Sequence, residues 1–189
     1  MNMEINPSEY KILIVDDVMS NVLLLKVLLT NEKFAIATAN NGRQALEQVD
    51  KERPDLLLLL DVMMPDLSGF EVAQRLKSNP DTADIPIIFL TALNSTTDIV
   101  KGFQAGASDF ISKPFNKEEL IIRVTHQISL VAAKRIILNK TEELQRIIAG
   151  RDKLYSVIAH DLRSPMGSIK MVLNMLILNL PAEKIGDET

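Results

Sequence analysis

Five short apolar runs, separated by amphipathic segments, restrict the fold of this chain more than any other feature of its sequence. The run 56–60 consists of leucine alone, which is typical of a strand buried on both faces of a parallel sheet. The five runs are Lys11–Val15, Phe34–Ala39, Asp55–Leu60, Pro86–Leu90 and Asp109–Ser112. Helical patterns follow them at about 18–31, 42–51, 69–78, 95–104 and from 117 onward.

This alternation of strands and helices predicts an α/β fold. We expect a doubly wound sheet of five parallel strands in the flavodoxin-like order 2-1-3-4-5. Right-handed crossovers place helices on both faces of such a sheet, and the carboxyl ends of its strands form a binding crevice. Residues 115–149 contain neither proline nor glycine, so a long C-terminal helical extension is expected after the sheet.

Composition excludes several kinds of site. The chain has no cysteine and two histidines, His126 and His160, which rules out a disulfide framework, a thiol nucleophile and a Cys- or His-rich zinc site. Its net charge of −4 argues against generic nucleic-acid binding. No apolar run approaches the roughly 20 residues that cross a bilayer, and the first residues do not form a secretory signal. We therefore expect a cytoplasmic protein with no nucleic-acid partner and no membrane segment.

Three acidic residues stand at the ends of strands that should be neighbours: Asp16 and Asp17 after the first strand, and Asp61 after the third. One such Asp is most often a loop or helix-capping residue. Three converging carboxylates would repel one another, and Mg²⁺ relieves that repulsion. Thr91 and Lys113 follow the fourth and fifth strands and can contact phosphoryl oxygens. The set predicts phosphoryl transfer to Asp61 as nucleophile, with Mg²⁺ as Lewis acid.

Residues 10–125 resemble a response-regulator receiver domain. The resemblance implies that Asp61 is the phosphoacceptor and also a ligand of Mg²⁺, and that Lys113 neutralises the phosphate. The motifs that carry it are Ile12–Asp17, Asp61–Asp66, Leu90–Ala92 and Gly106–Phe115.

The same resemblance assigns roles to further residues. It implies that Asp16 and Asp17 organise Mg²⁺ and that the carbonyl of Met63 is another ligand. Thr91 and Phe110 are implied as a switch pair, in which the hydroxyl moves to the phosphate while the aromatic ring turns inward.

The region after the receiver-like segment has the pattern of a coiled coil. Apolar residues recur at alternating spacings of about three and four, and Arg151 interrupts them. We expect a helical stalk that forms a parallel homodimer; the alternative is a long amphipathic helix that packs on its own domain. The recurring residues are Ile137, Leu144, Ile147 or Ile148, Leu154 and Ile158.

His160 and Asp161 place an imidazole beside a carboxylate on this helix. A neutral imidazole can attack a phosphoryl group while a neighbouring acid orients or takes its proton, although His-Asp pairs alone are common. The longer segment Ser156–Pro165 resembles the H-box of sensor histidine kinases. This resemblance implies that His160 is the phosphorylated histidine and that Asp161 is its acid–base partner.

The expected organisation has three parts: a receiver domain (1–125), a coiled-coil-like linker (126–150), and the first helix of a truncated dimerisation and phosphotransfer domain (151–189). The leading interpretation is a piece of a hybrid histidine kinase whose receiver regulates the kinase core. Its partner is a kinase catalytic domain or another cognate phosphodonor. No glycine-rich nucleotide loop occurs, so no ATP-dependent kinase activity is expected from this chain alone.

Two alternatives remain open. In the first, the chain is a stand-alone response regulator with an inert His160 and a helical tail that dimerises or binds a partner. In the second, it is a pseudo-receiver that acts only as a scaffold.

Overall fold

The structure, a computed structural model, describes residues 5–59, 62, 64–91 and 96–178. Its elements follow the predicted alternation of strands and helices, preceded by a single 3₁₀ turn. In chain order they are η1 (Pro7–Glu9), β1 (Lys11–Val15), α1 (Met19–Asn31), β2 (Ala35–Ala39), α2 (Gly42–Glu52), β3 (Leu56–Leu59), α3 (Gly69–Ser78), β4 (Ile87–Thr91), α4 (Thr96–Gln104), β5 (Asp109–Ser112) and α5 (Lys117–Leu178).

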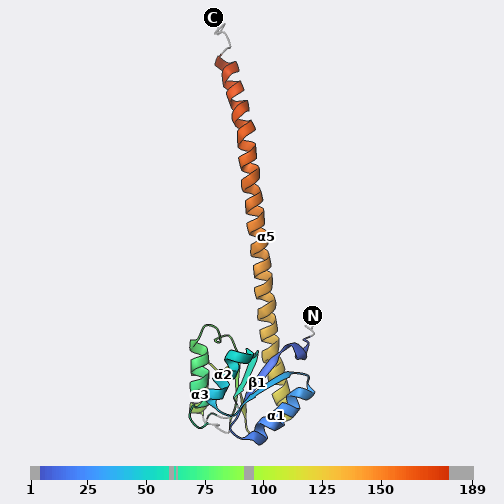
Figure 1. The fold of residues 1–189 in the computed structure, drawn as a ribbon, viewed down its shortest axis with the longest axis vertical. Coiled ribbons are helices and arrows are strands. Elements are labelled where there is room, and N and C mark those ends of the chain that lie inside the picture. The colour runs from blue at the N-terminus through green and yellow to red at the C-terminus, as the bar shows by residue number, and fades with distance from the viewer. Residues whose placement is uncertain (1–4, 60–61, 63, 92–95, 179–189) are drawn as a thin grey trace, which may run out of the picture. The chain divides into compact units, whose positions relative to one another are not determined.

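The five strands form one sheet that is parallel throughout, in the order β2-β1-β3-β4-β5 (Figure 1). This confirms the predicted fold class and strand order. In the register, Val15 pairs with Leu59, and Thr91 pairs with Ser112. Because all strands run in one direction, their carboxyl ends lie at the same edge of the sheet.

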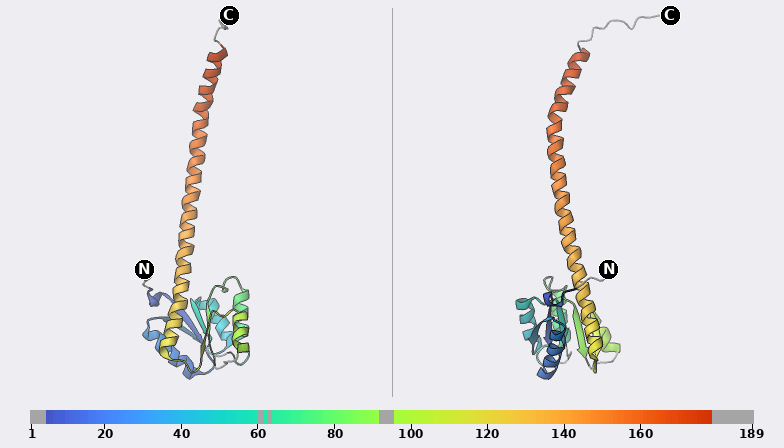
Figure 2. Two further views of the ribbon diagram at one scale, coloured as in Figure 1. Left: turned by 180° about the vertical axis from the view of Figure 1, so that it is seen from behind. Right: turned by 90° about the vertical axis from the view of Figure 1, so that its right-hand side faces the viewer.

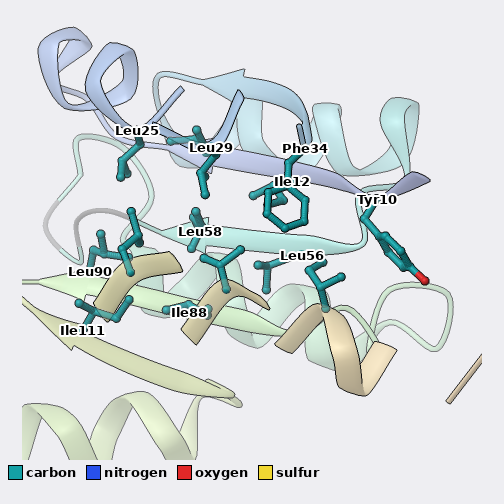
Figure 3. Packing of buried hydrophobic residues seen from close by; sticks show 14 of the residues in the cluster. Tyr10, Ile12, Leu25, Leu29, Phe34, Leu56, Leu58, Ile88, Leu90 and Ile111 are labelled. Carbon is teal, nitrogen blue, oxygen red and sulfur yellow. The ribbon is translucent and has the colours of Figure 1, made fainter. Parts of the chain in front are cut away.

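Successive residues of a strand point to opposite faces of a sheet, so strands that are apolar throughout require cover on both faces. On one face, α1 and the first turns of α5 cover the sheet (Figure 2). Figure 3 shows the side chains of the strands packed beside those of α1. The buried members of this cluster include Ile12, Ile14, Leu56, Leu58, Ile88, Leu90 and Ile111 of the strands, Leu25 and Leu29 of α1, and Leu120, Val124, Ile128 and Ala132 of α5.

The opposite face is covered by α2 and α3, and residues that directly follow α4 also pack there. Leu57 and Phe89 of the strands are fully buried there, against Val49 of α2 and Val72 of α3. The sequence pattern of uninterrupted apolar strands therefore has a direct structural counterpart, because two separate cores share one sheet.

The chain divides into two compact units, Met1–Arg135 and Ile136–Thr189. The core of the first unit extends beyond residue 125, because Ile128 and Ala132 are buried in it. In the second unit, every side chain that the structure describes between 136 and 176 is exposed. The helix α5 includes Pro165. Among the described residues, no helix is both long enough and apolar enough to span a membrane.

Two ion pairs hold the last α5 residues of the first unit. Arg135 Nη2 lies 2.6 Å from Asp55 Oδ1, just before β3, and Lys134 Nζ lies 2.5 Å from Asp84 Oδ1, before β4. The Arg135 guanidinium also lies over the ring of Tyr10, 5.5 Å from its centroid. These contacts join Lys134 and Arg135 to the segments that precede β3 and β4.

Candidate functional site

Among the acidic residues that the structure describes in the first unit, Asp16 is the most buried, with 1% of its surface exposed. Its backbone amide continues the pairing of β1 with β2 by donating to the carbonyl of Ala39. Its carboxylate accepts hydrogen bonds from residues that follow it in the chain. Oδ1 accepts one from the backbone amide of Val18 at 2.6 Å, and Oδ2 accepts one from the side-chain amide of Asn21 at 3.0 Å. These bonds fix the carboxylate at the carboxyl end of β1 and join it to the first turn of α1.

Lys113 and Thr91 come to the same edge from β5 and β4. The ammonium of Lys113 lies 3.6 Å from Oδ2 of Asp16, and its side chain is one-quarter exposed. Its backbone amide donates to the carbonyl of Thr91 at 3.0 Å, and Thr91 is buried. The Lys113–Pro114 peptide bond is cis. The fold thus brings together three of the five residues that were expected to do chemistry here.

Phe110 lies in β5, two residues before Ser112, and its ring is half-buried. It stacks on Phe89 of β4, with ring centroids 5.2 Å apart and an interplanar angle of 26°. Its centroid also lies 5.2 Å from that of Phe103 in α4. The ring occupies space beside Gly102, where an added Cβ would lie 1.9 Å from Phe110 Cζ. Glycine at 102 is therefore what allows the ring to take this position.

The remaining predicted residues of this edge are placed unequally. Asp17 follows Asp16 and is exposed. Asp61 and Met63, the expected phosphoacceptor and carbonyl ligand, lie outside the described residues. Within the described ranges, no group of three or more acidic or histidine side chains is arranged to hold a metal ion.

The described donors at this edge nevertheless fit a hard cation. Mg²⁺ binds oxygen ligands, keeps several waters and needs only one or two carboxylates. A carboxylate oxygen has about two acceptor positions, and Oδ1 of Asp16 accepts one hydrogen bond from the described residues. The neighbouring Asp17 adds an exposed carboxylate. Asp16 and Asp17 can therefore supply oxygen ligands from the end of β1.

His160 and Asp161 lie in the second unit, on α5. Their side chains are 83% and 72% exposed, and Nδ1 of His160 lies 3.4 Å from Oδ1 of Asp161. The predicted coupling of imidazole and carboxylate is thus present in the geometry. Both groups are open to solvent.

Two further residues position side chains of this site, and the sequence analysis does not predict their roles. Asn21 holds the Asp16 carboxylate, and Gly102 gives the Phe110 ring its space. Asn21 stands five residues after Asp16, on the first turn of the following helix, and that spacing was the available signal. Nothing in the local sequence marks Gly102, because its role depends on a strand packed beside its helix.

Comparison with protein-family models matches residues 12–125 to the response regulator receiver domain. The chain belongs to this family. Receiver domains act in two-component phosphorelays, in which histidine kinases are their phosphodonors.

One curated relative is the response regulator PleD of Caulobacter vibrioides. It is 42% identical over 141 residues, which make up 75% of this chain and 30% of PleD. The chain therefore spans about a third of the length of that relative.

Solved receiver domains have the same fold. One, from a signal transduction histidine kinase of Syntrophus aciditrophicus, is 36% identical, with a TM-score of 0.60 over 64% of this chain and 90% of that one. Another, from a sensor histidine kinase of Pseudomonas aeruginosa, is 28% identical, with a TM-score of 0.59 over 64% and 98%. The latter is described with a magnesium ion coordinated in its active-site cleft.

Proposed function

We propose that Asp61 of this receiver domain accepts a phosphoryl group in a reaction that depends on Mg²⁺. One observation carries the proposal: the buried carboxylate of Asp16 lies 3.6 Å from the ammonium of Lys113, at the edge where β1 and β5 end. Asp61 follows β3, the strand that pairs with β1. A fixed acid and a fixed cation beside that strand supply what phosphoryl transfer to a carboxylate needs.

The residues at this edge have separate roles in the reaction. Asp16 and Asp17 would hold Mg²⁺, together with Asp61 and the carbonyl of Met63. When bound, Mg²⁺ neutralises charge that develops on the transferred group. Lys113 contributes a second positive charge, which would bind a phosphoryl oxygen of the acyl phosphate on Asp61.

Thr91 and Phe110 report the phosphorylation to the rest of the domain. The Thr91 hydroxyl turns to the phosphate, and the Phe110 ring moves into the space that this motion opens. The ring already lies between Phe89 and Phe103. Its movement therefore changes the packing of α4 against the sheet, which is a two-state signal that a partner can read.

A small phosphodonor tests the central step. The chain is incubated with acetyl phosphate and Mg²⁺, and its phosphorylated fraction is read on a phosphate-affinity gel. Asp61→Asn should abolish the shifted band. Asp66→Asn is the matched control, because Asp66 is exposed and its φ of 72° is a conformation that Asn tolerates. A shifted band that survives Asp61→Asn overturns the proposal.

We further propose that the chain is part of a hybrid histidine kinase. In this reading, residues 126–150 link the receiver (1–125) to the first helix of a dimerisation and phosphotransfer domain. His160 is its phosphoacceptor, Asp161 its acid–base partner, and two copies pair in parallel through α5. The support is the contact between His160 and Asp161, together with the exposure of every described side chain between 136 and 176.

A stand-alone response regulator is the second candidate, and the similarity to the response regulator PleD favours it. The two functions differ in the fate of His160. The chain is incubated with ATP and the catalytic domain of a cognate kinase, and acid-labile label is mapped. Label that disappears in His160→Gln supports the hybrid kinase. Absence of acid-labile label supports the stand-alone regulator, because phosphohistidine is labile to acid whereas an aspartyl phosphate is labile to base.

A further inference from the structure

The exposed helix of the second unit carries two series of residues. Within each series the residues are seven apart, and the second series begins four residues after the first. Seven-residue repeats on a helix place a stripe along one side, and paired stripes wind into a left-handed coiled coil. Nine of the twelve positions are large apolar residues, and all nine are exposed. The first series is Ile137, Leu144, Arg151, Ile158, Pro165 and Val172, and the second is Thr141, Ile148, Tyr155, Leu162, Ile169 and Leu176.

Arg151 is the one charged residue in this stripe. Its Nη2 lies 3.1 Å from Oδ1 of Asp152, the next residue, and its Nε lies 3.3 Å from the same oxygen. Its guanidinium also lies over the ring of Tyr155, 5.9 Å from the centroid. Both ionic side chains are about 60% exposed, so the ion pair can exchange partners.

We infer that Arg151 and Asp152 set the register and the parallel orientation of a dimer between two copies of this chain. A charged residue in a coiled-coil seam costs stability but selects the pairing in which its charge is matched. When two copies pair in parallel and in register, both Arg151 side chains meet in one layer. Asp152 flanks that layer on each helix, so each guanidinium can bind the carboxylate of the other copy and the layer is neutral.

Other pairings leave the Arg151 charge without this match. A slip of one heptad places Arg151 opposite Leu144 or Ile158 of the other copy. In an antiparallel pair with the stripe fully overlapped, Arg151 meets Leu162 of the other copy. A slipped pair therefore brings the guanidinium against an apolar side chain, away from Asp152 of the other copy. In the antiparallel pair the two Arg151 side chains lie in separate layers, and the carboxylate next to Leu162 is that of Asp161, which already contacts His160 of its own chain. The inference rests on the proposed pairing of two copies, and it does not depend on phosphorylation of Asp61.

The absence of cysteine makes a direct test practical, because a single introduced thiol reports only its own neighbour. Thr141→Cys places a thiol in the stripe. Two such thiols come within disulfide range, with Cα atoms about 4.4–6.8 Å apart, when the copies pair in parallel and in register. In the antiparallel pair, position 141 faces Val172 instead. The full chain is oxidised with diamide and cross-linked dimer is measured, while sedimentation velocity gives the total dimer.

We expect Thr141→Cys to cross-link nearly all of the dimer. Adding Arg151→Leu should tighten the dimer about tenfold, because an apolar residue replaces a charge in the stripe. It should also lower the cross-linked share at least about twofold, because register and orientation relax. Arg146→Leu is the matched control, since it makes the same change at a residue that is outside both series.

The outcomes separate the inference from the proposals beneath it. A dimer in which Arg151→Leu cross-links as fully as the parent overturns the role of Arg151 and leaves the dimer standing. A dimer that does not cross-link at position 141 overturns the parallel, in-register arrangement. A chain that sediments as a monomer overturns the pairing itself, whether or not Asp61 takes phosphate.

Discussion

Replacing Gly102 by alanine should favour the helix α4 but displace the Phe110 ring that packs beside it. Gly102 lies in α4, and a Cβ there would lie 1.9 Å from Phe110 Cζ and 2.6 Å from its Cε2. Normal van der Waals contact begins at about 3.4 Å. The Phe110 ring must therefore leave its position against Phe89 and Phe103.

The size of the effect follows from what the ring loses and what the helix gains. Each aromatic pair is worth about 0.5–1.5 kcal/mol, so two pairs are worth about 1–3 kcal/mol. Alanine in a helix is better than glycine by about 1 kcal/mol. Gly102→Ala should therefore lower the free energy of unfolding by about 0–2 kcal/mol. In a Phe110→Ala background the clash is absent, and the same substitution should raise it by about 1 kcal/mol.

Equilibrium urea unfolding of the four proteins in this cycle provides the measurement. The coupling energy between positions 102 and 110 should be about 1–3 kcal/mol. Gly167→Ala serves as control, because nothing lies within 4 Å of the Cβ that it would add. Equal effects of Gly102→Ala with and without the Phe110 ring would refute the reasoning that the glycine makes room for the ring.

Three further outcomes are expected. Asp16→Asn should weaken Mg²⁺ binding at least about tenfold in isothermal titration calorimetry, because a charged oxygen ligand is lost. Ile128→Ala should destabilise the first unit by about 2–5 kcal/mol, since Ile128 is fully buried past residue 125, whereas Ile137→Ala should leave it unchanged. Glu71→Ala should be less stable than the parent at neutral pH, and the difference should shrink as pH falls below 4.5. The hydrogen bond from the Ser68 hydroxyl holds the pKa of Glu71 below its ordinary value of 4.5, and protonation of Glu71 removes that stabilisation. Urea unfolding measures both stability effects.

The sheet could be predicted from the sequence because its strands are apolar on both faces. Uniform runs such as 56–60 leave few alternatives to a buried parallel strand. The convergence of Asp16, Thr91 and Lys113 followed from the same prediction, because residues that end parallel strands meet at one edge. That part of the site needed only topology.

Other features depended on packing that periodicity does not reveal. The helix α1 is apolar on both sides: Leu25 is buried, while Met19, Leu23 and Val27 are exposed. Its pattern therefore does not indicate which face covers the sheet. The contact of Phe110 with Gly102 joins residues of different elements, and no local signal marks it.

The end of the first unit was also beyond a sequence argument. The apolar positions of α5 continue at intervals of four through Ile128, Ala132 and the exposed Ile136, so the repeat does not change where burial ends. Burial stops where the sheet stops, and Arg135 marks that point by pairing with Asp55. Such a limit is set by the size of the sheet and not by the helix itself.

The central claim is that Asp61 is the phosphoacceptor, and chemical trapping tests it most directly. The chain is treated with acetyl phosphate and Mg²⁺, reduced with borohydride and digested for mass spectrometry. Reduction converts an aspartyl phosphate to homoserine. The account predicts homoserine at position 61, dependent on both the phosphodonor and Mg²⁺. Homoserine at another aspartate, or none anywhere while a phosphorylated band is present, would contradict it.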